Sequence, residues 1–301
     1  MRKSLLLTAA ALIALVIPTL AAPALAKPLA IGDMEEYTAA HDDTLVKIAR
    51  QFNLGFVELR AANPSVDPWL PGEGTKLTIP KWNLLPTAPH EGIVINVPEM
   101  RVYVYAKDKN NPITFPIAIG REGLETPIGT TTIQRKTKDP IWRPTPRMRA
   151  EDPKLPAQVG PGPENPMGTH ALYLGWPSFA IHGTNKPYAI GRRASSGCIR
   201  MYPEDITQMF EMLPAGTKVT TVNQPIKLAW IDNVLYLEAH PDLDQAIQME
   251  ETGQVYLSKL TDADLQLVMK AAGEHKDRLQ WAAIRNAIRE TEKTIARLQG
   301  E

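Results

Sequence analysis

The sequence predicts a mainly β protein of three folded parts that follow an apolar N-terminal segment. Apolar residues recur at a period of two across residues 92–224, which is the spacing of β-strands. Helical spacing is confined to a short stretch before this region and a longer one after it. The 27 prolines among 301 residues also disfavour long helices. We therefore expect a central β domain over 92–224 with one or two short helices, a β-α-α-β unit over 35–81, and a hairpin followed by helices over 225–301.

The strands of the central domain are indicated by alternating apolar and polar residues. The first two surround a turn at Pro98–Glu99, and another ends at His182. Residues 138–168 contain too many prolines and glycines for regular structure, so we expect a long loop that acts as a lid or binding wall. A short helix over PEDITQMFEML stops before Pro214. The strand segments are IVINVPEMRVYVYAKD, TFPIAIG, GTTTIQRK, HALYLGW, FAIHGTN and TKVTTVNQ.

The unit over 35–81 shows both strand and helix signals in a short space. EYTA is a strand candidate, and Asp43 or Thr44 can cap a helix with an apolar face. A second short helix runs from Phe56 to Ala62, and TKLTIP is a closing strand that ends at Pro80. A proline-containing linker, KWNLLPTAPHEG, follows this unit.

The part over 225–301 begins with a hairpin that turns at Asp232–Asn233. The stretch from Thr261 to the C-terminus reads as helical, with an apolar face opposite a face of mixed charge. Because that charge lacks a basic bias, packing on its own protein is favoured over a membrane-surface helix. The apolar face consists of Ile284, Ile288, Ile295 and Leu298.

The first 26 residues have the three regions of a secretory signal peptide. MRK is a positive start, SLLLTAAALIALVIPTL is an apolar run, and an A-x-A cleavage site ends at Ala26. A transmembrane anchor is the alternative, but the run is short and contains Pro18. We expect cleavage after Ala26 and a mature chain with no transmembrane segment.

Composition narrows the kinds of partner and cofactor. The 33 basic and 33 acidic residues cancel, so no surface for nucleic acid is indicated. No cluster of cysteine, histidine and acidic residues has the spacing of a metal site, so we expect neither a metal nor a cofactor.

Cys198 is the only cysteine, so an exported chain would carry it as a free thiol. A thiol with a pKa of about 8.5 becomes a nucleophile when a base takes its proton, and the imidazole of His182 has a suitable pKa of about 6.5. Small neighbours leave the thiol approachable, and Gly197 lets the backbone amides turn toward an oxyanion. In an extended segment Arg200 shares a face with Cys198 and can bind a carboxylate. The residues alone leave a buried structural cysteine equally open.

The N-terminal unit resembles a LysM module in its tyrosine-threonine opening, its DTL helix start, and its ELRAANP and PGEGTKLTIP segments. The resemblance implies binding to glycan that contains N-acetylglucosamine, such as peptidoglycan. It places the sugar contacts in two loops, at Asp43 and Thr44 and at Asn63 and Pro64. The Asp42–Asp43 pair departs from the glycine-aspartate of many members. A packing unit without a ligand is the alternative.

The central domain resembles the L,D-transpeptidases with a YkuD-type catalytic domain, through IHGTN, SSGCIRM, GLETPIGTTTIQRK and NPMGTHALYLGW. The resemblance implies a mixed β-sandwich in which Cys198 is the nucleophile and His182 its base. It further implies that the Gly183 carbonyl orients the imidazole, that amides from Ser196 through Gly197 to Cys198 form an oxyanion hole, and that Arg200 binds the donor stem. Ser196 stands where many members have a second histidine, and His170 is the other imidazole upstream.

The two resemblances together imply a periplasmic enzyme of the enterobacterial type that modifies peptidoglycan. Cys198 would attack meso-diaminopimelate in a tetrapeptide stem, release D-alanine, and pass the acyl group to an amine. The acceptor is either another stem or the C-terminal lysine of an outer-membrane lipoprotein. Two alternatives remain, a hydrolase that uses the same residues and a wall-binding scaffold without catalysis.

Overall fold

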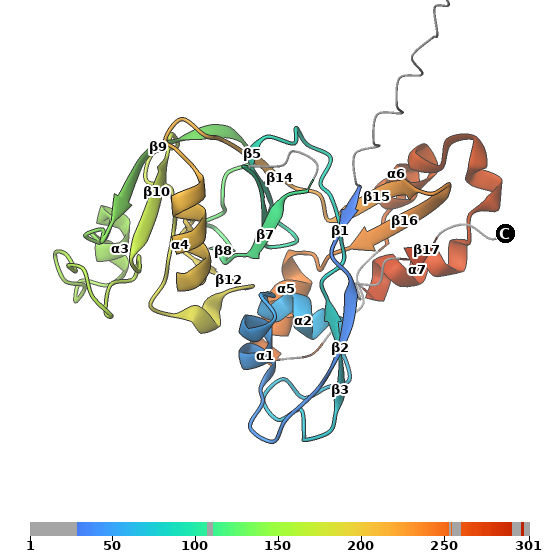
Figure 1. Cartoon of the computed structure of the whole chain (residues 1–301), viewed down its shortest axis with the longest axis horizontal. Helices are drawn as coiled ribbons and strands as arrows, with labels where there is room; N and C mark the ends of the chain where they lie inside the picture. The colour runs from blue at the N-terminus through green and yellow to red at the C-terminus, as the bar shows by residue number, and fades with distance from the viewer. Residues whose placement is uncertain (1–28, 107–110, 253, 255–259, 291–295, 298–301) are drawn as a thin grey trace, which may run out of the picture.

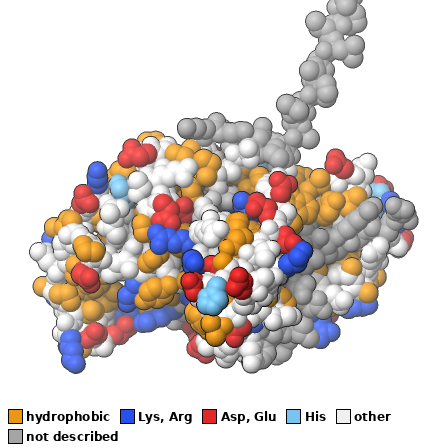
Figure 2. Space-filling view, turned by 60° about the horizontal axis from the view of Figure 1, so that its bottom comes forward, with side chains coloured by type: hydrophobic (Ala, Val, Ile, Leu, Met, Phe, Trp, Pro, Cys, Tyr) orange, Lys and Arg blue, Asp and Glu red, His pale blue; other side chains and the backbone are white. Residues whose placement is uncertain are grey.

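The computed structural model describes residues 29–106, 111–252, 254, 260–290 and 296–297 (Figure 1). The predicted signal peptide over 1–26 lies outside these residues. Within the described ranges, no helix is both long and apolar enough to cross a membrane. On the face shown in Figure 2, acidic and basic side chains are interspersed, as the zero net charge suggests.

The N-terminal unit has its elements in the predicted order of strand, helix, helix and strand. Strand β2 pairs antiparallel with β3, and the two helices bury their apolar faces beside this pair. The hydroxyl of Thr44 accepts a 3.2 Å hydrogen bond from the amide of Lys47, which caps the first helix. The elements are β2 (Met34–Thr38), α1 (Leu45–Gln51), α2 (Phe56–Ala62) and β3 (Lys76–Pro80).

The central domain is a mixed sheet of eight strands in the order β13-β11-β10-β9-β14-β5-β6-β7. The pairs β14–β5 and β11–β13 are parallel, and the other neighbours are antiparallel. The strands are β5 (Gly92–Asn96), β6 (Arg101–Tyr105), β7 (Ile113–Pro116), β9 (Gly129–Lys138), β10 (His170–Leu174), β11 (Ala180–His182), β13 (Ile199–Arg200) and β14 (Lys218–Val222).

Three short elements complete the site side of this domain. Strand β8 (Ile119–Gly120) pairs parallel with β12 (Arg193–Ser195), which follows the 3₁₀ turn η1 (Pro187–Ala189). Helix α4 (Pro203–Met212) packs against β10, and its Ile206 and Met209 enter the core.

Two predicted irregular segments contain regular structure. Within residues 138–168, helix α3 (Pro146–Glu151) forms because Thr145 caps it and proline is tolerated in its first turn. In the predicted linker, β4 (Asn83–Leu84) pairs with β1 (Ala30–Ile31), and Leu84 is fully buried. Both predictions were wrong because caps and long-range pairing supply hydrogen bonds that local composition does not reveal.

The C-terminal part begins with the predicted hairpin of β15 (Ile226–Ile231) and β16 (Val234–Ala239). Asp232 and Asn233 both have positive φ, at 49° and 62°, as a tight hairpin turn requires. The remaining elements are α5 (Leu243–Thr252), α6 (Asp262–Ala272), η2 (Gly273–Arg278), α7 (Trp281–Glu290) and β17 (Ala296–Arg297).

The predicted helix from Thr261 to the C-terminus is corrected by the structure. Gly273, with φ of 56°, ends α6, and β17 adds to the edge of β16 in place of a helical continuation. Ile284 and Ile288 are buried in the core of this part, as predicted. Ile295 and Leu298 lie outside the described residues.

Helix α5, which the sequence analysis did not predict, joins the three parts. It lies beside α2 at their junction (Figure 1). Its Ala246 and Met249 belong to the same apolar core as α2 and the central sheet. The N-terminal unit is therefore packed on the rest of the chain as part of one core.

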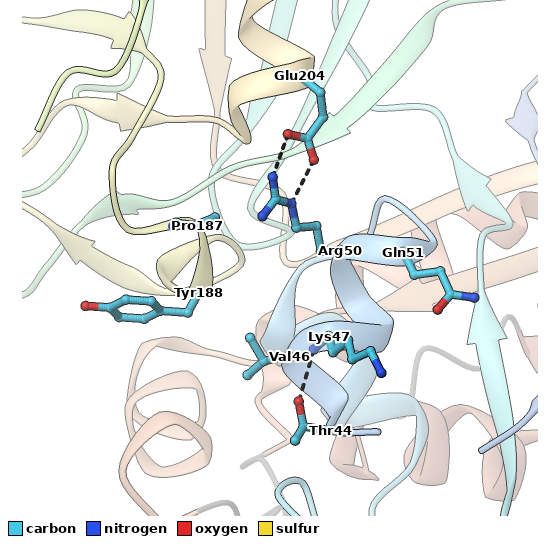
Figure 3. A pocket seen from close by; sticks show the side chains of 8 residues that line it. All are labelled: Thr44, Val46, Lys47, Arg50, Gln51, Pro187, Tyr188 and Glu204. Carbon is cyan, nitrogen blue, oxygen red and sulfur yellow. Dashed lines mark hydrogen bonds and ion pairs between the residues drawn. The ribbon is translucent and has the colours of Figure 1, made fainter. Parts of the chain in front are cut away.

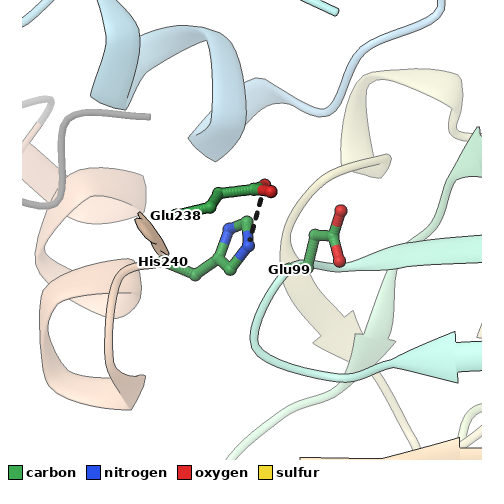
Figure 4. Close-up of side chains that lie close together, drawn as sticks. All are labelled: Glu99, Glu238 and His240. Carbon is green, nitrogen blue, oxygen red and sulfur yellow. Dashed lines mark ion pairs between the residues drawn. The ribbon is translucent and has the colours of Figure 1, made fainter. Parts of the chain in front are cut away.

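A buried charge cluster also lies at this junction. Glu99, Glu238 and His240 are close enough to hold a cation (Figure 4). The ammonium of Lys227 already lies 3.0 Å from a carboxylate oxygen of each glutamate. Because a lysine supplies the positive charge there, we assign no metal to the cluster.

Candidate active site

The ends of two parallel strands bring the predicted catalytic residues together. His182 is in register with Arg200, and Ile181 is in register with Ile199. Since side chains alternate across a sheet, the two isoleucines point into the core while His182 and Arg200 share the other face. Cys198, two residues before Arg200, lies on that same face, where it packs against Ala180 and its neighbours. The expectation that Arg200 and Cys198 share a face is confirmed.

The imidazole of His182 is buried and held by the backbone. Its Nδ1 lies 2.6 Å from the carbonyl oxygen of Gly183, so we assign the proton to Nδ1, which leaves the lone pair on Nε2. Burial lowers the pKa of His182 to about 4, the nearby charge of Arg200 acts in the same direction, and the Gly183 and Met167 carbonyls oppose both. His182 is therefore a neutral base near pH 7.

The thiol of Cys198 is half-buried. Its Sγ lies 3.5 Å from the carbonyl oxygen of Ser178, to which it donates a hydrogen bond in place of one to His182. Burial raises the pKa of Cys198, while the amide of Ala180 and the charge of Arg200 oppose that rise. Thiol and imidazole are thus both neutral, and the proton must move as the nucleophile attacks.

The turn before the thiol is fixed by two buried hydroxyl groups. Ser195 Oγ accepts a 3.1 Å hydrogen bond from the Gly197 amide and donates to the Cys198 carbonyl. Thr126 Oγ1 donates to the Gly197 carbonyl over 3.0 Å. Gly197 has φ of +109°, and a Cβ there would lie 2.9 Å from Phe179. Glycine is therefore required at this position.

This geometry narrows the choice of amides for the predicted oxyanion hole. The Gly197 amide was expected in the oxyanion hole, but it is already paired with Ser195. The amides of Ser196 and Cys198 have no acceptor among the described residues, so they are the remaining candidates. The sequence analysis missed Ser195 and Thr126 as supporting residues, because nothing local shows which hydroxyl faces the turn.

Part of the Arg200 guanidinium has no hydrogen-bond partner among the described residues. Its Nη1 donates to the Ala194 carbonyl over 3.3 Å, while its buried Nε has no partner among the described residues. Burial lowers the pKa of Arg200, and Cys198 and Tyr188 both oppose that effect, so both lie within electrostatic reach. A buried donor without a partner is costly and suits a carboxylate ligand.

His170 does not belong to this site. It lies one residue before the position that pairs with His182, so its side chain is on the opposite face of the sheet. Its Nδ1 is 2.9 Å from Thr169 Oγ1 and 3.3 Å from Thr207 Oγ1, and its ring packs on Phe210. His170 is thus buried against α4, and Ser196 supplies no imidazole, so His182 is the imidazole on the face of Cys198.

Two of the four predicted glycan contacts use their side chains inside the fold. Asp43 accepts hydrogen bonds from Tyr37 (2.7 Å) and the amide of Ala40 (2.8 Å), which lower its pKa, the amide more strongly. Asn63 bridges α2 and β3, because its amide group donates to the carbonyls of residues 59 and 78 and accepts from the amide of residue 78. The glycan-contact roles of Asp43 and Asn63 stay predictions. Thr44 is half-buried as a helix cap, and Pro64 is exposed.

The segment that leads to Cys198 is held from outside the central domain. The amides of Phe56 and Val57, at the start of α2, each donate over 3.2 Å to the carbonyls of residues 190 and 191. A Cβ on Gly191 would lie 2.2 Å from Gly55, so the two backbones meet without room for a side chain. Glu250 of α5 accepts a 2.7 Å hydrogen bond from the amide of residue 193.

Comparison with known proteins identifies the family. The model of the L,D-transpeptidase catalytic domain named YkuD matches residues 90–221. The chain is 44% identical over 221 residues to "Probable L,D-transpeptidase YbiS" of Escherichia coli K12, covering 71% of this chain and 72% of the relative. It is 42% identical over 227 residues to "Probable L,D-transpeptidase YcfS" of the same strain, covering 72% and 71%. It is 30% identical over 190 residues to YkuD of Bacillus subtilis, also an L,D-transpeptidase by name, covering 62% and 98%.

The fold and the site together therefore define the class of protein. It has a mainly β domain of the YkuD type that carries a thiol, an imidazole and a guanidinium on one face of the sheet. The chain belongs to the L,D-transpeptidase family, as its sequence motifs predicted.

Proposed function

We propose that this chain is a cysteine-dependent L,D-transpeptidase that acts on the tetrapeptide stems of peptidoglycan in the periplasm. The observation that carries the proposal is the single sheet face shared by Cys198, His182 and the partly unpaired Arg200. Family membership supports the reaction class. The N-terminal segment with the three regions of a signal peptide supports the location.

In the first half-reaction, Cys198 Sγ attacks the carbonyl carbon at the L-centre of meso-diaminopimelate. Its proton passes to His182 Nε2, and the amides of Ser196 and Cys198 receive the developing oxyanion. When the tetrahedral intermediate collapses, the bond to D-alanine breaks and its amine takes the proton from His182. The product is a thioester on Cys198 and free D-alanine.

In the second half-reaction, an acceptor amine attacks the thioester. His182 takes one proton from that amine and returns it to the departing thiol, so a new amide forms and the enzyme is regenerated. The acceptor is a second stem's diaminopimelate or the C-terminal lysine of an outer-membrane lipoprotein. Because the energy of one amide bond is kept in the thioester, no cofactor or ATP is consumed.

The role we propose for Arg200 is to bind the carboxylate of the donor stem. Its buried Nε has no partner and its side chain forms no ion pair among the described residues, which makes it the available cation beside the thiol. We also propose that the N-terminal unit is a LysM module that holds the enzyme on glycan. Its β-α-α-β order and its motifs support this assignment.

The test is to incubate the purified mature chain with tetrapeptide muropeptides, with and without a peptide that ends in the lipoprotein lysine. Mass spectrometry should show D-alanine release and a new cross-linked or peptide-linked product. Cys198→Ala should abolish both, while binding to isolated cell wall survives. Full activity of Cys198→Ala would exclude the thiol mechanism.

The same experiment distinguishes a transpeptidase from the alternative enzyme, a hydrolase. If the only products are free acids, water is the acceptor and the chain is a hydrolase with the same pair of residues. If neither products nor an acyl-enzyme mass appears with wild-type protein, the non-catalytic scaffold is the better assignment.

A further inference from the structure

A groove runs between α1 of the N-terminal unit and the turn η1 of the central domain. Its volume is about 620 Å³, which is within the range of ligand sites. In Figure 3 the Arg50–Glu204 pair closes one end, and Thr44 lies toward the other. The groove is lined by Thr44, Val46, Lys47, Arg50, Gln51, Pro187, Tyr188 and Glu204.

The walls of this groove are held in place relative to each other. Arg50 donates from Nε and Nη2 to the two carboxylate oxygens of Glu204, at 2.9 and 3.0 Å. Directly behind the groove, the amides of Phe56 and Val57 bind the carbonyls that follow η1. Because two parts of the chain meet through backbone hydrogen bonds and one core, the groove is preformed.

The lining favours a neutral ligand that has both apolar faces and hydroxyl groups. Tyr188 is 56% exposed, and Val46 faces its turn from α1 (Figure 3). The charges of the lining are already paired within the chain, Arg50 with Glu204 and Lys47 with Asp43 at 3.1 Å. A charged peptide would find no unpaired partner here, whereas a sugar ring can stack on an exposed tyrosine.

Tyr188 of the groove belongs to η1, in the chain segment that leads to Cys198. The carbonyl of Tyr188 accepts a 3.1 Å hydrogen bond from Arg192, which precedes β12. Tyr188 also lies within electrostatic reach of Arg200, as does Cys198. A polymer lying in the groove would therefore contact the segment that leads to Cys198.

We propose that this groove binds the glycan strand of peptidoglycan, next to the stem that is presented to Cys198. The proposal rests on the proposed function and adds to it a glycan site shared by the N-terminal unit and the central domain. The contacts are the ring of Tyr188 and the apolar wall at Val46, with a hydrogen bond from Thr44.

The test measures calorimetric binding of chitotetraose to the full mature chain carrying Cys198→Ala, so that no chemistry occurs. Adding Tyr188→Ala should weaken binding about fivefold, because one aromatic contact is lost. Tyr188→Phe should bind like the parent, since it keeps the ring. Val46→Asp should weaken binding as much, because it places a charge in the apolar wall. Trp69→Ala removes an aromatic side chain that is 53% exposed outside the groove, and it should have little effect.

Parental affinity in both Tyr188→Ala and Val46→Asp would overturn the proposal, as would a loss confined to Trp69→Ala. Thermal unfolding of each variant checks that the fold is kept. The proposed function is judged separately, from the products of the wild-type enzyme. Acyl transfer with no effect of the groove variants on binding overturns only the groove, and groove binding without acyl transfer overturns only the enzyme mechanism.

Discussion

The two regions predicted to touch substrate use their polar groups in opposite ways. In the N-terminal unit, the side chains of Asp43 and Asn63 form hydrogen bonds within the fold. On the catalytic face, Arg200 Nε and the amides of Ser196 and Cys198 have no partner among the described residues. Burying a polar group without a partner costs about 1–3 kcal/mol. Because several such groups gather beside the thiol, we expect a ligand to supply the missing partners on this face.

The largest expected effect comes from removing the base on the catalytic face. His182→Gln should lower the rate of D-alanine release by about 10²–10⁴-fold, because Gln cannot accept the thiol proton. His275→Gln, at a half-exposed histidine far along the chain, is the matched control and should keep wild-type activity. A loss of less than about tenfold for His182→Gln would show that another group is the base.

The pH profile of acylation tests the same residue without mutation. Since the pKa of His182 is lowered to about 4, the imidazole stays neutral and the acylation rate should hold through pH 5. The rate should then fall as the pH drops through 4 and His182 takes up a proton. The measurement is the mass of the acyl-enzyme after a short reaction at each pH. A fall centred near the ordinary histidine pKa of about 6.5 would contradict the buried, neutral imidazole.

The same shift has a consequence for stability. Between pH 6.5 and 4 the unfolded chain binds a proton at His182 that the folded chain does not, so the free energy of unfolding should decrease as the pH falls. In the acylation assay, short reaction times keep this loss of stability at low pH separate from the loss of activity. Urea unfolding of wild type and His182→Gln across this range isolates the contribution, which the variant should lack.

Arg200→Lys should reduce kcat/KM about 10–100-fold, because lysine is a point charge and cannot replace a two-pronged contact with a carboxylate. The loss should lie mainly in KM if the guanidinium binds the donor stem. Arg285→Lys, at an exposed position of α7, is the control. Equal kcat/KM for Arg200→Lys and wild type would remove Arg200 from substrate binding.

In the N-terminal unit, where the side chain of Asn63 has its hydrogen-bond partners, the expected effect is on stability. Asn63→Ala should lower the free energy of unfolding by about 1–3 kcal/mol, because it leaves the amide and carbonyl of Thr78 without their partner. Pro64→Ala, at the exposed neighbour, should change it little. Urea unfolding measures both. An unchanged stability for Asn63→Ala, together with weaker glycan binding, would support Asn63 as a sugar contact.

The smallest effect is expected at the helix that supports the catalytic segment. Glu250→Ala removes the acceptor for the Arg193 amide and should slow acylation about two- to fivefold, by loosening the strand before Cys198. Glu250→Gln keeps an acceptor oxygen and should restore the rate. Glu251→Ala, at the exposed next residue, is the control. No difference between the Ala and Gln variants would assign α5 a purely structural role.

Much of the site was predictable because it is local. The alternation of side chains along a strand places Cys198 and Arg200 on one face, two residues apart. The carbonyl that orients His182 belongs to the next residue, Gly183. The cap at Thr44 and the hairpin turn at Asp232–Asn233 also depend on near neighbours, and both were predicted.

The sequence by itself therefore determined the family, the order of the main elements and the catalytic face, since these depend on short spacings and specific motifs. Only the tertiary structure decided which polar groups remain unpaired and how the three parts meet. The deciding contacts join residues far apart in the chain, as between Asn63 and Thr78, Gly55 and Gly191, and Glu250 and Arg193. No periodicity records such pairs, because each is set by the packing of a whole element against another.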